Sequence, residues 1–205
     1  MYVPEAFAES RLPVLHNAID GCGLAIFVTC SPDGPVATHV PMLLARDEGE
    51  FGTLHFHLAR ANGQWRGAAR ALAIFPGPDG YVSPAWYASK AEHGRVVPTW
   101  NYVVVHAAGT AEIYEDADRL RGLVSRLTER HEARRATPWA VSDAPAAYIE
   151  SQLRAIVGVR LPIADLQGKW KLGQNRPAAD RAGMLAGYDA AGTAAYQALA
   201  AATRG

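Results

Sequence analysis

LAIFVTCSPDGPVATHVPMLLA, residues 24–45, is the stretch of this 205-residue chain that decides its fold. Its two arms, residues 24–30 and 36–45, are rich in the β-branched and apolar side chains that are typical of β-strands. The segment SPDGP between them places proline, aspartate and glycine where a tight reversal of the chain needs them. We therefore predict a β-hairpin in this part of the chain.

Short apolar runs separated by Gly, Pro and Asp continue outward from the hairpin. Strands are predicted over residues 53–58, 71–75, 97–107, 111–114 and 155–164, and helices over residues 9–21, 116–135, 145–153 and 190–203. Strands and helices do not alternate regularly, so a doubly wound parallel sheet is not expected. The pattern indicates an antiparallel barrel or sandwich with flanking helices, a mainly β fold of the α+β class. At this length we expect a single domain over residues 1–205, with a C-terminal helical extension.

The composition excludes several classes of protein. Twenty basic and twenty acidic residues leave a formal net charge of zero, without the basic excess of a nucleic-acid or anionic-membrane binder. The first residues lack the pattern of a secretory leader, and no apolar run reaches the ~18 residues of a membrane span, so we expect a cytoplasmic protein. Cys22 and Cys30 lack metal or redox spacing, and we expect them to be small buried side chains.

The segment GYVSPAWYASKAEHGRVVPTWNY, residues 80–102, mixes tryptophan and tyrosine rings with hydroxyl, amide and cationic groups. Such a mixture is typical of a wall that holds a planar, anionic ligand with polar edges. Residues 36–41 and 56–65 have the same character, and residues 168–181 repeat it. We expect these segments to converge on one site.

Arg60 and Asn62 belong to FHLARANGQW, residues 56–65, which ends a predicted strand. In a turn that leads into a short helix, backbone N–H groups and the Arg60 guanidinium would bind a phosphate. Alternatively, Asn62 only caps the helix and Arg60 is a solvated surface residue. The residues alone leave both interpretations open.

The remaining chemistry-bearing residues do not form a recognisable catalytic motif. His39, His55 and His57 lie on predicted strands, but no carboxylate stands at matching spacing, so stacking or hydrogen bonding is favoured over metal binding. Ser83 and Ser89 lie outside any GxSxG motif, and the glycine-rich dinucleotide and phosphate loops are absent. We therefore name no catalytic residue and no metal ligand.

Several short motifs together resemble one family. They are MYVP at residues 1–4, ATHVP at 37–41, HLARANGQW at 57–65, YVSPAWYASK at 81–90, VVPTWNY at 96–102, LRAIVG at 153–158, KLGQNR at 171–176 and DR at 180–181. The chain resembles the FMN-binding split-barrel proteins, and more closely the PaiB-type FMN-binding negative transcriptional regulators. The resemblance implies a six-stranded antiparallel split β-barrel and a homodimer with FMN at the subunit interface.

The resemblance also implies a set of cofactor-binding residues. They are Thr38, His39, His57, Arg60, Asn62, Lys90, Thr99, Trp100, Asn101, Gln174, Asn175 and Arg176. In this interpretation Thr38 and His39 lie beside the flavin ring, Arg60 and Asn62 approach the phosphate, and residues 174–176 reach across the dimer.

Three functions follow as hypotheses. The first is a flavin-binding negative transcriptional regulator, for which direct DNA binding is not expected because no helix-turn-helix is evident. The second is an FMN-dependent oxidoreductase, such as a flavin reductase or oxidase, that uses a nicotinamide nucleotide or another small molecule. The third is haem binding or degradation, suggested by His39, His55 and His57. Whether the protein is an enzyme stays open at this stage.

Overall fold

A computed structural model describes residues 1–67 and 69–204 of the chain. The chain divides into two compact units. Unit 1 comprises Met1–Ala18, Pro76–Val105 and Gln167–Gly205, and unit 2 comprises Ile19–Phe75 and His106–Leu166. The expectation of a single domain stays a prediction.

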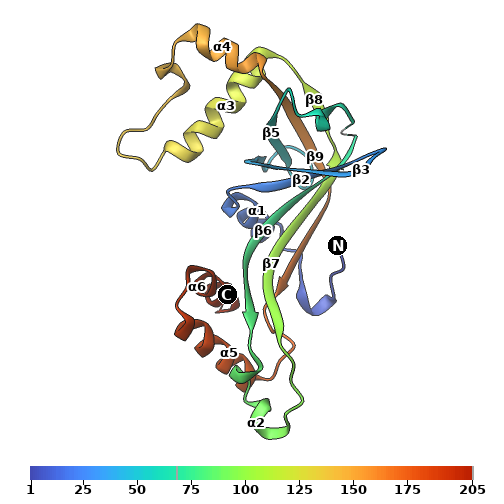
Figure 1. Cartoon of the computed structure of the whole chain (residues 1–205), viewed down its shortest axis with the longest axis vertical. Coiled ribbons are helices and arrows are strands. Elements are labelled where there is room, and N and C mark those ends of the chain that lie inside the picture. Colours follow the sequence, from blue (N-terminus) through green and yellow to red (C-terminus); the bar gives the residue numbers. More distant parts are fainter. Residues whose placement is uncertain (68, 205) are drawn as a thin grey trace. The chain divides into compact units, whose positions relative to one another are not determined.

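The described residues form a nine-stranded sheet (Figure 1). Its strands are β1 (Ala8–Glu9), β2 (Ala25–Ser31), β3 (Gly34–Val40), β4 (Leu43–Ala45), β5 (Thr53–Ala59), β6 (Arg70–Val82), β7 (Thr99–Thr110), β8 (Glu112–Tyr114) and β9 (Ile156–Lys171). The order is β3-β2-β6-β7-β9-β5-β4, and β1 and β8 also pair with β9. The pairs β2–β3, β2–β6, β4–β5, β5–β9, β1–β9 and β8–β9 are antiparallel, which confirms the predicted α+β class.

The expected number of six strands is wrong. The predicted arm over residues 36–45 is divided into β3 and β4, because Pro41 has no N–H for a sheet ladder. The shortest strands, β1, β4 and β8, have only two or three residues each, and of these three only β1 lies outside the predicted runs. Closure of the sheet into a barrel stays a prediction.

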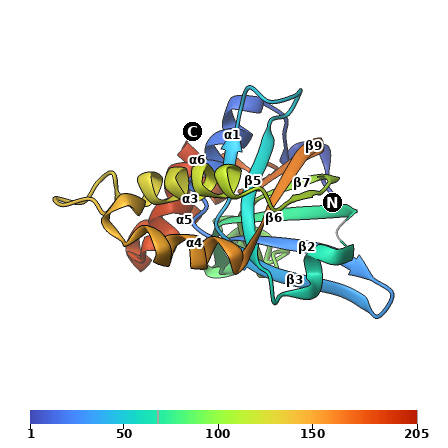
Figure 2. The ribbon, with the colours of Figure 1, turned by 90° about the horizontal axis from the view of Figure 1, so that it is seen from above.

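The predicted hairpin is confirmed in unit 2, where β2 and β3 lie side by side (Figure 2). Ser31 pairs with Gly34 across a two-residue turn, and Gly34 has a φ of 120°, a conformation that residues with a Cβ rarely adopt. Phe27 of β2 packs edge-to-face on Phe56 of β5, with ring centres 4.8 Å apart, and both rings are fully buried. The apolar residues of the hairpin therefore form part of the core.

The predicted amphipathic helix over residues 116–135 is observed in unit 2 as α3 (Ala117–Glu132). Asp116 caps it by accepting a hydrogen bond from the Arg119 amide. Leu120 of α3 packs on Ile149 and Leu153 of α4 (Ala146–Arg154), beside which it runs in Figures 1 and 2. A short 3₁₀ helix, η4 (Val141–Asp143), precedes α4.

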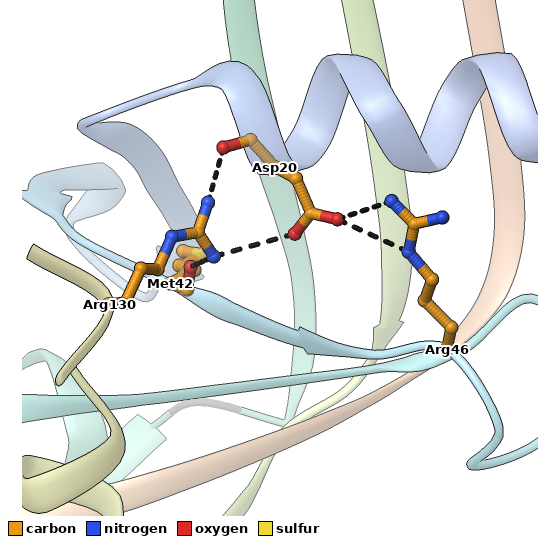
Figure 3. A network of polar contacts seen from close by, with 4 residues as sticks. All are labelled: Asp20, Met42, Arg46 and Arg130. Atoms are coloured by element: carbon orange, nitrogen blue, oxygen red, sulfur yellow. Dashed lines mark hydrogen bonds and ion pairs between the residues drawn. The ribbon is translucent and has the colours of Figure 1, made fainter. Parts of the chain in front are cut away.

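Asp20 links three segments of unit 2 (Figure 3). It lies in the last turn of α1 (Leu12–Gly21), and its carboxylate accepts hydrogen bonds from Arg46 at 2.5 and 3.2 Å. Arg130 of α3 donates to the Asp20 carbonyl, lies 3.4 Å from the Asp20 carboxylate and donates to the Met42 carbonyl at 3.4 Å. An arginine thus binds a carbonyl that the helix end leaves unpaired.

Unit 1 contains the C-terminal helices α5 (Ala178–Ala191) and α6 (Ala194–Arg204) and the short helix α2 (Ser89–His93). The predicted terminal helix corresponds to α6, whereas α5 was not predicted. Gly183 and Gly187 let α5 approach the 3₁₀ turn η3 (Pro84–Trp86), because a Cβ at Gly187 would lie 2.4 Å from the Trp86 ring. Around this contact lies a core of residues Val82, Tyr87, Val103, Leu172, Met184, Tyr188, Leu199 and Ala200.

Two further 3₁₀ segments complete the described structure, η1 (Glu5–Phe7) and η2 (Gly63–Gly67). The cysteine prediction is wrong: Cys30 is exposed and Cys22 is half-buried. Cys30 lies on β2 beside the turn of the hairpin, where little of the protein covers the strand. In the part of the chain that the structure describes, no helix has the length and apolar character needed to cross a membrane.

Candidate functional site

The twelve predicted cofactor-binding residues fall into two groups, one in each unit. Unit 2 holds Thr38, His39, His57, Arg60 and Asn62, and unit 1 holds Lys90, Thr99, Trp100, Asn101, Gln174, Asn175 and Arg176. Within its unit each group is brought together only in part.

In unit 2, Thr38 and Asn62 meet at a glutamine that sequence reasoning missed. The Thr38 hydroxyl accepts from Asn62 Nδ2 at 2.9 Å and donates to Gln64 Oε1 at 2.5 Å. Gln64 Nε2 donates to the carbonyls of Phe27 and Val36 at 3.1 Å, and its backbone N–H donates to Asn62 Oδ1 at 3.0 Å. Gln64 is buried and fastens η2 to the β2–β3 hairpin. Its place inside the ARANGQW motif was the available signal.

Arg60 is held by protein groups. Its Nε donates to the Arg154 carbonyl at 2.7 Å, its Nη1 to Glu115 Oε2 at 2.5 Å and its Nη2 to the Ile156 carbonyl at 3.2 Å. It lines a cavity of about 380 Å³ together with the carboxylates of Glu115, Asp118 and Glu150. These contacts give Arg60 a structural role between β5 and the junction of α4 with β9. They do not support the predicted phosphate clamp, because the Arg60 guanidinium is already engaged by Glu115 and two carbonyl groups. Arg121 and Arg154 also line the cavity, so its charges are mixed.

Arg66 is a second residue that sequence reasoning missed. It lies in η2, exposed, with its guanidinium carbon 4.9 Å from the centre of the Trp65 ring. Within residues 1–67 and 69–204 it forms no ion pair. The positive charge of Arg66, two positions after Gln64 in η2, is therefore not neutralised by a carboxylate of the described residues.

The three histidines have different surroundings. His39 is exposed, whereas His55 Nε2 lies 3.0 Å from Glu48 Oε2. Burial lowers the pKa of His57, and its buried Nδ1 has no hydrogen-bond partner among the residues that the structure describes. His57 lines a cavity of about 370 Å³ whose walls include Leu127 and Trp139. Among the described residues, no cluster of His, Cys, Asp or Glu has a geometry suited to a metal ion.

In unit 1, four of the predicted residues line one cavity of about 210 Å³. They are Thr99, Asn101, Asn175 and Arg176, and Tyr87 and Lys171 complete its polar wall. The Arg176 guanidinium carbon lies 4.7 Å from the centre of the Tyr87 ring. Lys171 Nζ donates to Thr99 Oγ1 and to the Trp100 carbonyl, both at 2.6 Å. Segments some seventy positions apart in the sequence therefore do converge, as predicted for this part of the site.

Buried hydrogen bonds join residues of this cavity and its surroundings to helix α5. Asn101 is buried on β7, and its Nδ2 donates to the Tyr188 hydroxyl at 2.8 Å and approaches the Met184 sulfur at 3.1 Å. Burial raises the pKa of Tyr188 to about 12, so its hydroxyl stays protonated. Asp180 is buried on α5 and accepts hydrogen bonds from the Ser89 amide at 2.9 Å and the Ser89 hydroxyl at 3.0 Å, which fixes α2 to α5.

Three predicted residues of unit 1 do not line the cavity. Gln174 is exposed and closes its own turn, accepting from the Leu172 amide and donating to the Trp170 carbonyl. Lys90 is exposed on α2. The Trp100 side chain is 55% exposed and packs edge-to-face against Tyr81, with ring centres 6.1 Å apart.

Comparison with known proteins defines the class. Residues 1–165 match the protein family described as "Putative FMN-binding domain", and the chain belongs to this family. The match contains the predicted residues from Thr38 to Asn101 and ends before residues 174–176.

Two relatives extend over most of the chain. The protease synthase and sporulation protein PAI 2 of Bacillus subtilis is 33% identical over 184 residues, which cover 88% of this chain and 85% of that protein. An uncharacterized protein of Aspergillus fumigatus is 34% identical over 241 residues, which cover 94% of this chain and 92% of that protein.

Solved structures share the fold. A conserved hypothetical protein from Mycobacterium tuberculosis, Rv2991, has a TM-score of 0.59 at 14% identity and covers 86% of this chain and 94% of its own. The FAD and heme binding protein from Mycobacterium smegmatis has a TM-score of 0.61 at 20% identity, covering 91% and 80%. At these identities the likeness concerns the fold alone.

Proposed function

We propose that the protein is an FMN-binding regulatory protein of the PaiB type. The observation that carries this proposal is the family match over residues 1–165, which includes the ATHVP, HLARANGQW and VVPTWNY motifs. The relationship to PAI 2 supports the regulatory part, because that protein is named for protease synthesis and sporulation.

The side chains predicted in unit 2 offer polar groups of the kinds that could bind FMN. Thr38, Asn62 and Gln64 supply hydroxyl and amide groups, which suit the polar edge of a flavin. The buried His57 Nδ1 has no hydrogen-bond partner in the described part of the chain. When bound, FMN supplies hydride and electron transfer. The chain's own residues bind and orient it, and no side chain is required as a general acid or base.

We place the phosphate of FMN at Arg66 rather than at Arg60. Arg60 is bound to Glu115 and two carbonyl groups, whereas Arg66 meets no carboxylate among the described residues. A cation with an unused hydrogen-bonding edge is the better partner for a dianion. Arg66 also lies in the same short helix as Gln64, next to Asn62.

A fluorescence titration of the apoprotein with FMN tests this placement. We expect Arg66→Ala to weaken FMN binding by about 2 kcal/mol, roughly 30-fold, because a charge-assisted hydrogen bond is lost. Arg60→Ala should lower the free energy of unfolding by about 2 kcal/mol through its lost contacts, with FMN affinity within roughly threefold of wild type. Arg134→Ala, at an exposed arginine of the same unit, is the matched control.

If Arg60→Ala instead weakens FMN binding more than Arg66→Ala does, the phosphate lies at Arg60. An absorbance spectrum of the purified protein gives the coarser test of the cofactor itself. If neither the purified protein nor apoprotein mixed with FMN shows a bound flavin band, the proposed function is wrong.

The homodimer with FMN at its subunit interface is part of the proposal. The exposed Trp100 and Tyr81 rings of unit 1 supply apolar surface that a second subunit would cover. Sedimentation velocity of the apoprotein and the FMN complex should give twice the mass of one chain. A monomer in both states would refute this part.

Regulation need not involve DNA directly, since the net charge is zero. We expect no gel shift of DNA from the protein's own upstream region at micromolar protein and moderate salt, with or without FMN. A discrete complex that unlabelled DNA of the same sequence displaces, and unrelated DNA does not, would show that the protein binds an operator.

One observation favours the FMN-dependent oxidoreductase as a second candidate. The cavity of about 210 Å³ in unit 1, which Lys171 and Arg176 line, offers room for a small polar molecule. Anaerobic mixing with NADH or NADPH should then bleach the oxidised flavin band, and an unchanged spectrum with both donors would reject this function. Among the described residues, no specific observation favours haem binding.

A further inference from the structure

A cavity of about 490 Å³ lies between α3 and the segment of residues 140–149, which contains η4 and the start of α4. All of its lining residues belong to unit 2, and α3 and α4 run side by side in Figures 1 and 2. The volume lies in the range of roughly 300–1,000 Å³ that is typical of small-molecule sites. The residues assigned to the cofactor do not line this cavity.

Helix α3 supplies the polar wall of the cavity. Arg121, Ser125, Thr128 and Glu129 line it, and their spacing places them on one face of the helix. Ser142 of η4 adds a third hydroxyl group. The described residues provide no ion pair for the two charged groups and no hydrogen-bond partner for the three hydroxyl groups. These polar side chains are therefore available to a ligand.

The facing wall is apolar and consists mainly of small side chains. Ala140, Ala144 and Ala146 line it, and the buried Ile149 contributes from α4. Because an alanine side chain ends at Cβ, this segment leaves space beside α3 that larger side chains would fill. A polar wall opposite an apolar wall is typical of a ligand site.

The two charges of the cavity are separated along α3. Arg121 and Glu129 are eight positions apart, which corresponds to about 12 Å along the helix axis, and Ser125 and Thr128 lie between them. Arg121 is half-buried, whereas Glu129 is exposed. A ligand that pairs with both must carry a negative group at one end and a positive group at the other.

An unmodified tripeptide has this arrangement of charges. Three extended residues span about 10 Å, so the terminal carboxylate and ammonium groups reach toward Arg121 and Glu129. Hydroxyl groups both donate and accept hydrogen bonds, which suits the N–H and C=O groups of the peptide bonds between the ends. Small apolar side chains of the peptide fit beside the alanines of the facing wall. A simple anion, in contrast, uses only Arg121.

We propose that this cavity binds a short linear peptide with free ends, its carboxylate at Arg121 and its ammonium group at Glu129. The inference goes beyond the proposed function and does not depend on it, since the lining residues belong to α3 and to residues 140–149. Thr128 also lines the cavity of about 370 Å³ that contains His57, so the two cavities adjoin within unit 2.

Isothermal calorimetry of the full-length protein with L-alanyl-L-alanyl-L-alanine (trialanine) tests the proposal at low ionic strength, where exposed charges are screened least. We expect saturable binding that is at least roughly tenfold weaker in Arg121→Gln, because a charge-assisted hydrogen bond is lost. Glu129→Gln should weaken it roughly threefold, since an exposed ion pair contributes less. Arg126→Gln, at an exposed position of the same helix that does not line the cavity, is the matched control.

Peptides with one blocked end assign the two charges. Trialanine amide lacks the carboxylate and N-acetyl-trialanine lacks the ammonium group, and both should bind wild type more weakly than trialanine. Arg121→Gln should bind trialanine and its amide about equally, and Glu129→Gln should bind trialanine and its N-acetyl form about equally. Each substitution removes the protein partner of the end that is blocked.

The midpoint of thermal unfolding, measured for each variant, verifies that it folds. Should Arg121→Gln fail to fold, the blocked peptides decide the question with wild type alone. Absence of saturable binding at millimolar trialanine, undiminished binding to a folded Arg121→Gln, or equal binding of free and blocked peptides to wild type would overturn the proposal.

A parallel FMN titration separates this proposal from the proposed function. We expect Arg121→Gln to bind FMN within roughly threefold of wild type, and trialanine to bind the FMN complex as it binds the apoprotein. Mutual exclusion of trialanine and FMN would show that the cavity belongs to the cofactor and would overturn the peptide site. Failure of FMN binding alone would refute the proposed function and leave the peptide site intact.

Discussion

Two arginines six positions apart show how the environment of a residue decides its role. Arg60 belongs to a motif that predicts phosphate binding, yet Glu115 and the carbonyls of Arg154 and Ile156 engage its guanidinium. Arg66 received no role from the sequence, although it stacks on Trp65 and meets no carboxylate among the described residues. Residue type indicates which chemistry is available, whereas the direction of the side chain depends on partners from distant segments.

Two glycines in helices, Gly187 and Gly122, give a prediction at the scale of single residues. Gly187→Ala should lower the free energy of unfolding by about 1–3 kcal/mol, because the new Cβ would lie 2.4 Å from the Trp86 ring. Gly122→Ala should raise it by about 0.5–1 kcal/mol, since Gly122 is an exposed position of α3 with no atom within 4 Å of a Cβ. Urea unfolding measures both, and equal effects of the two substitutions would contradict the close packing of α5 on Trp86.

His57 makes the free energy of unfolding depend on pH. Burial lowers its pKa from the ordinary value of 6.5, and His55 and His106 are shifted in the same direction, mainly by burial. Below pH 6.5 the unfolded chain therefore binds more protons than the folded chain, so stability is full above that pH and falls as the pH decreases toward the lowered pKa. Each such histidine contributes a slope of at most about 1.4 kcal/mol per pH unit.

His57→Gln should therefore flatten the pH dependence of the unfolding free energy between about pH 5 and 7. Urea titrations at a series of pH values measure this slope. His39→Gln, at an exposed position, is the control. An unchanged slope in His57→Gln would mean that other groups dominate acid destabilisation.

At the scale of elements, the hairpin and the amphipathic helix α3 followed from local pattern, because turn residues and apolar spacing are local properties. The ends of the strands did not follow from local pattern. β6 extends to Val82 and β9 to Lys171, well beyond the predicted runs, because pairing with neighbouring strands continues through PGPDG and LQGKW. Helix α5 was missed because its glycines disfavour a helix in isolation, whereas its packing on Trp86 needs them.

The polar contacts of Asp20 with Arg46 and Arg130, here called the Asp20 network, give a prediction about how neighbouring elements are held together. Arg130→Ala should lower the free energy of unfolding by about 2 kcal/mol, because Asp20 and Met42 lose a charged donor that joins α3 to the end of α1 (Figure 3). Arg135→Ala removes an exposed ion pair with Glu132 and should cost no more than about 0.5 kcal/mol. Similar losses from both would show that the Asp20 network adds nothing beyond a surface pair.

At the scale of the whole molecule, the C-terminal helices complete the core of unit 1. Leu199 and Ala200 of α6 are buried with Tyr188 of α5 and Val82 of β6, and the Tyr196 hydroxyl donates to the Tyr81 carbonyl at 2.9 Å. Ending the chain at Ala191 should therefore expose this core and lower the thermal unfolding midpoint by more than about 10 °C, since burial of one such side chain contributes about 1.5–3 kcal/mol. Ending the chain at Thr203 instead is the control, because it removes the exposed Arg204 and its ion pair with Asp189 but keeps Leu199 and Ala200.

Calorimetry of both truncated chains gives the midpoints. A chain ending at Ala191 that unfolds as cooperatively and at the same temperature as the full chain would show that α6 is dispensable. It would also mean that the buried positions of Leu199 and Ala200 contribute little to unit 1.

The sequence by itself determined the α+β class, the hairpin, α3 and the family, because these depend on residue types at short spacing and on motifs that stay readable in one dimension. Only the tertiary structure decided which cations are neutralised and which are not. The spacing of Arg60, Arg66, Lys171 and Arg176 along the chain does not show where carboxylates lie, and an electrostatic field depends on distances in space. The division of the predicted site residues between two units followed for the same reason, since contacts between distant segments are set by packing.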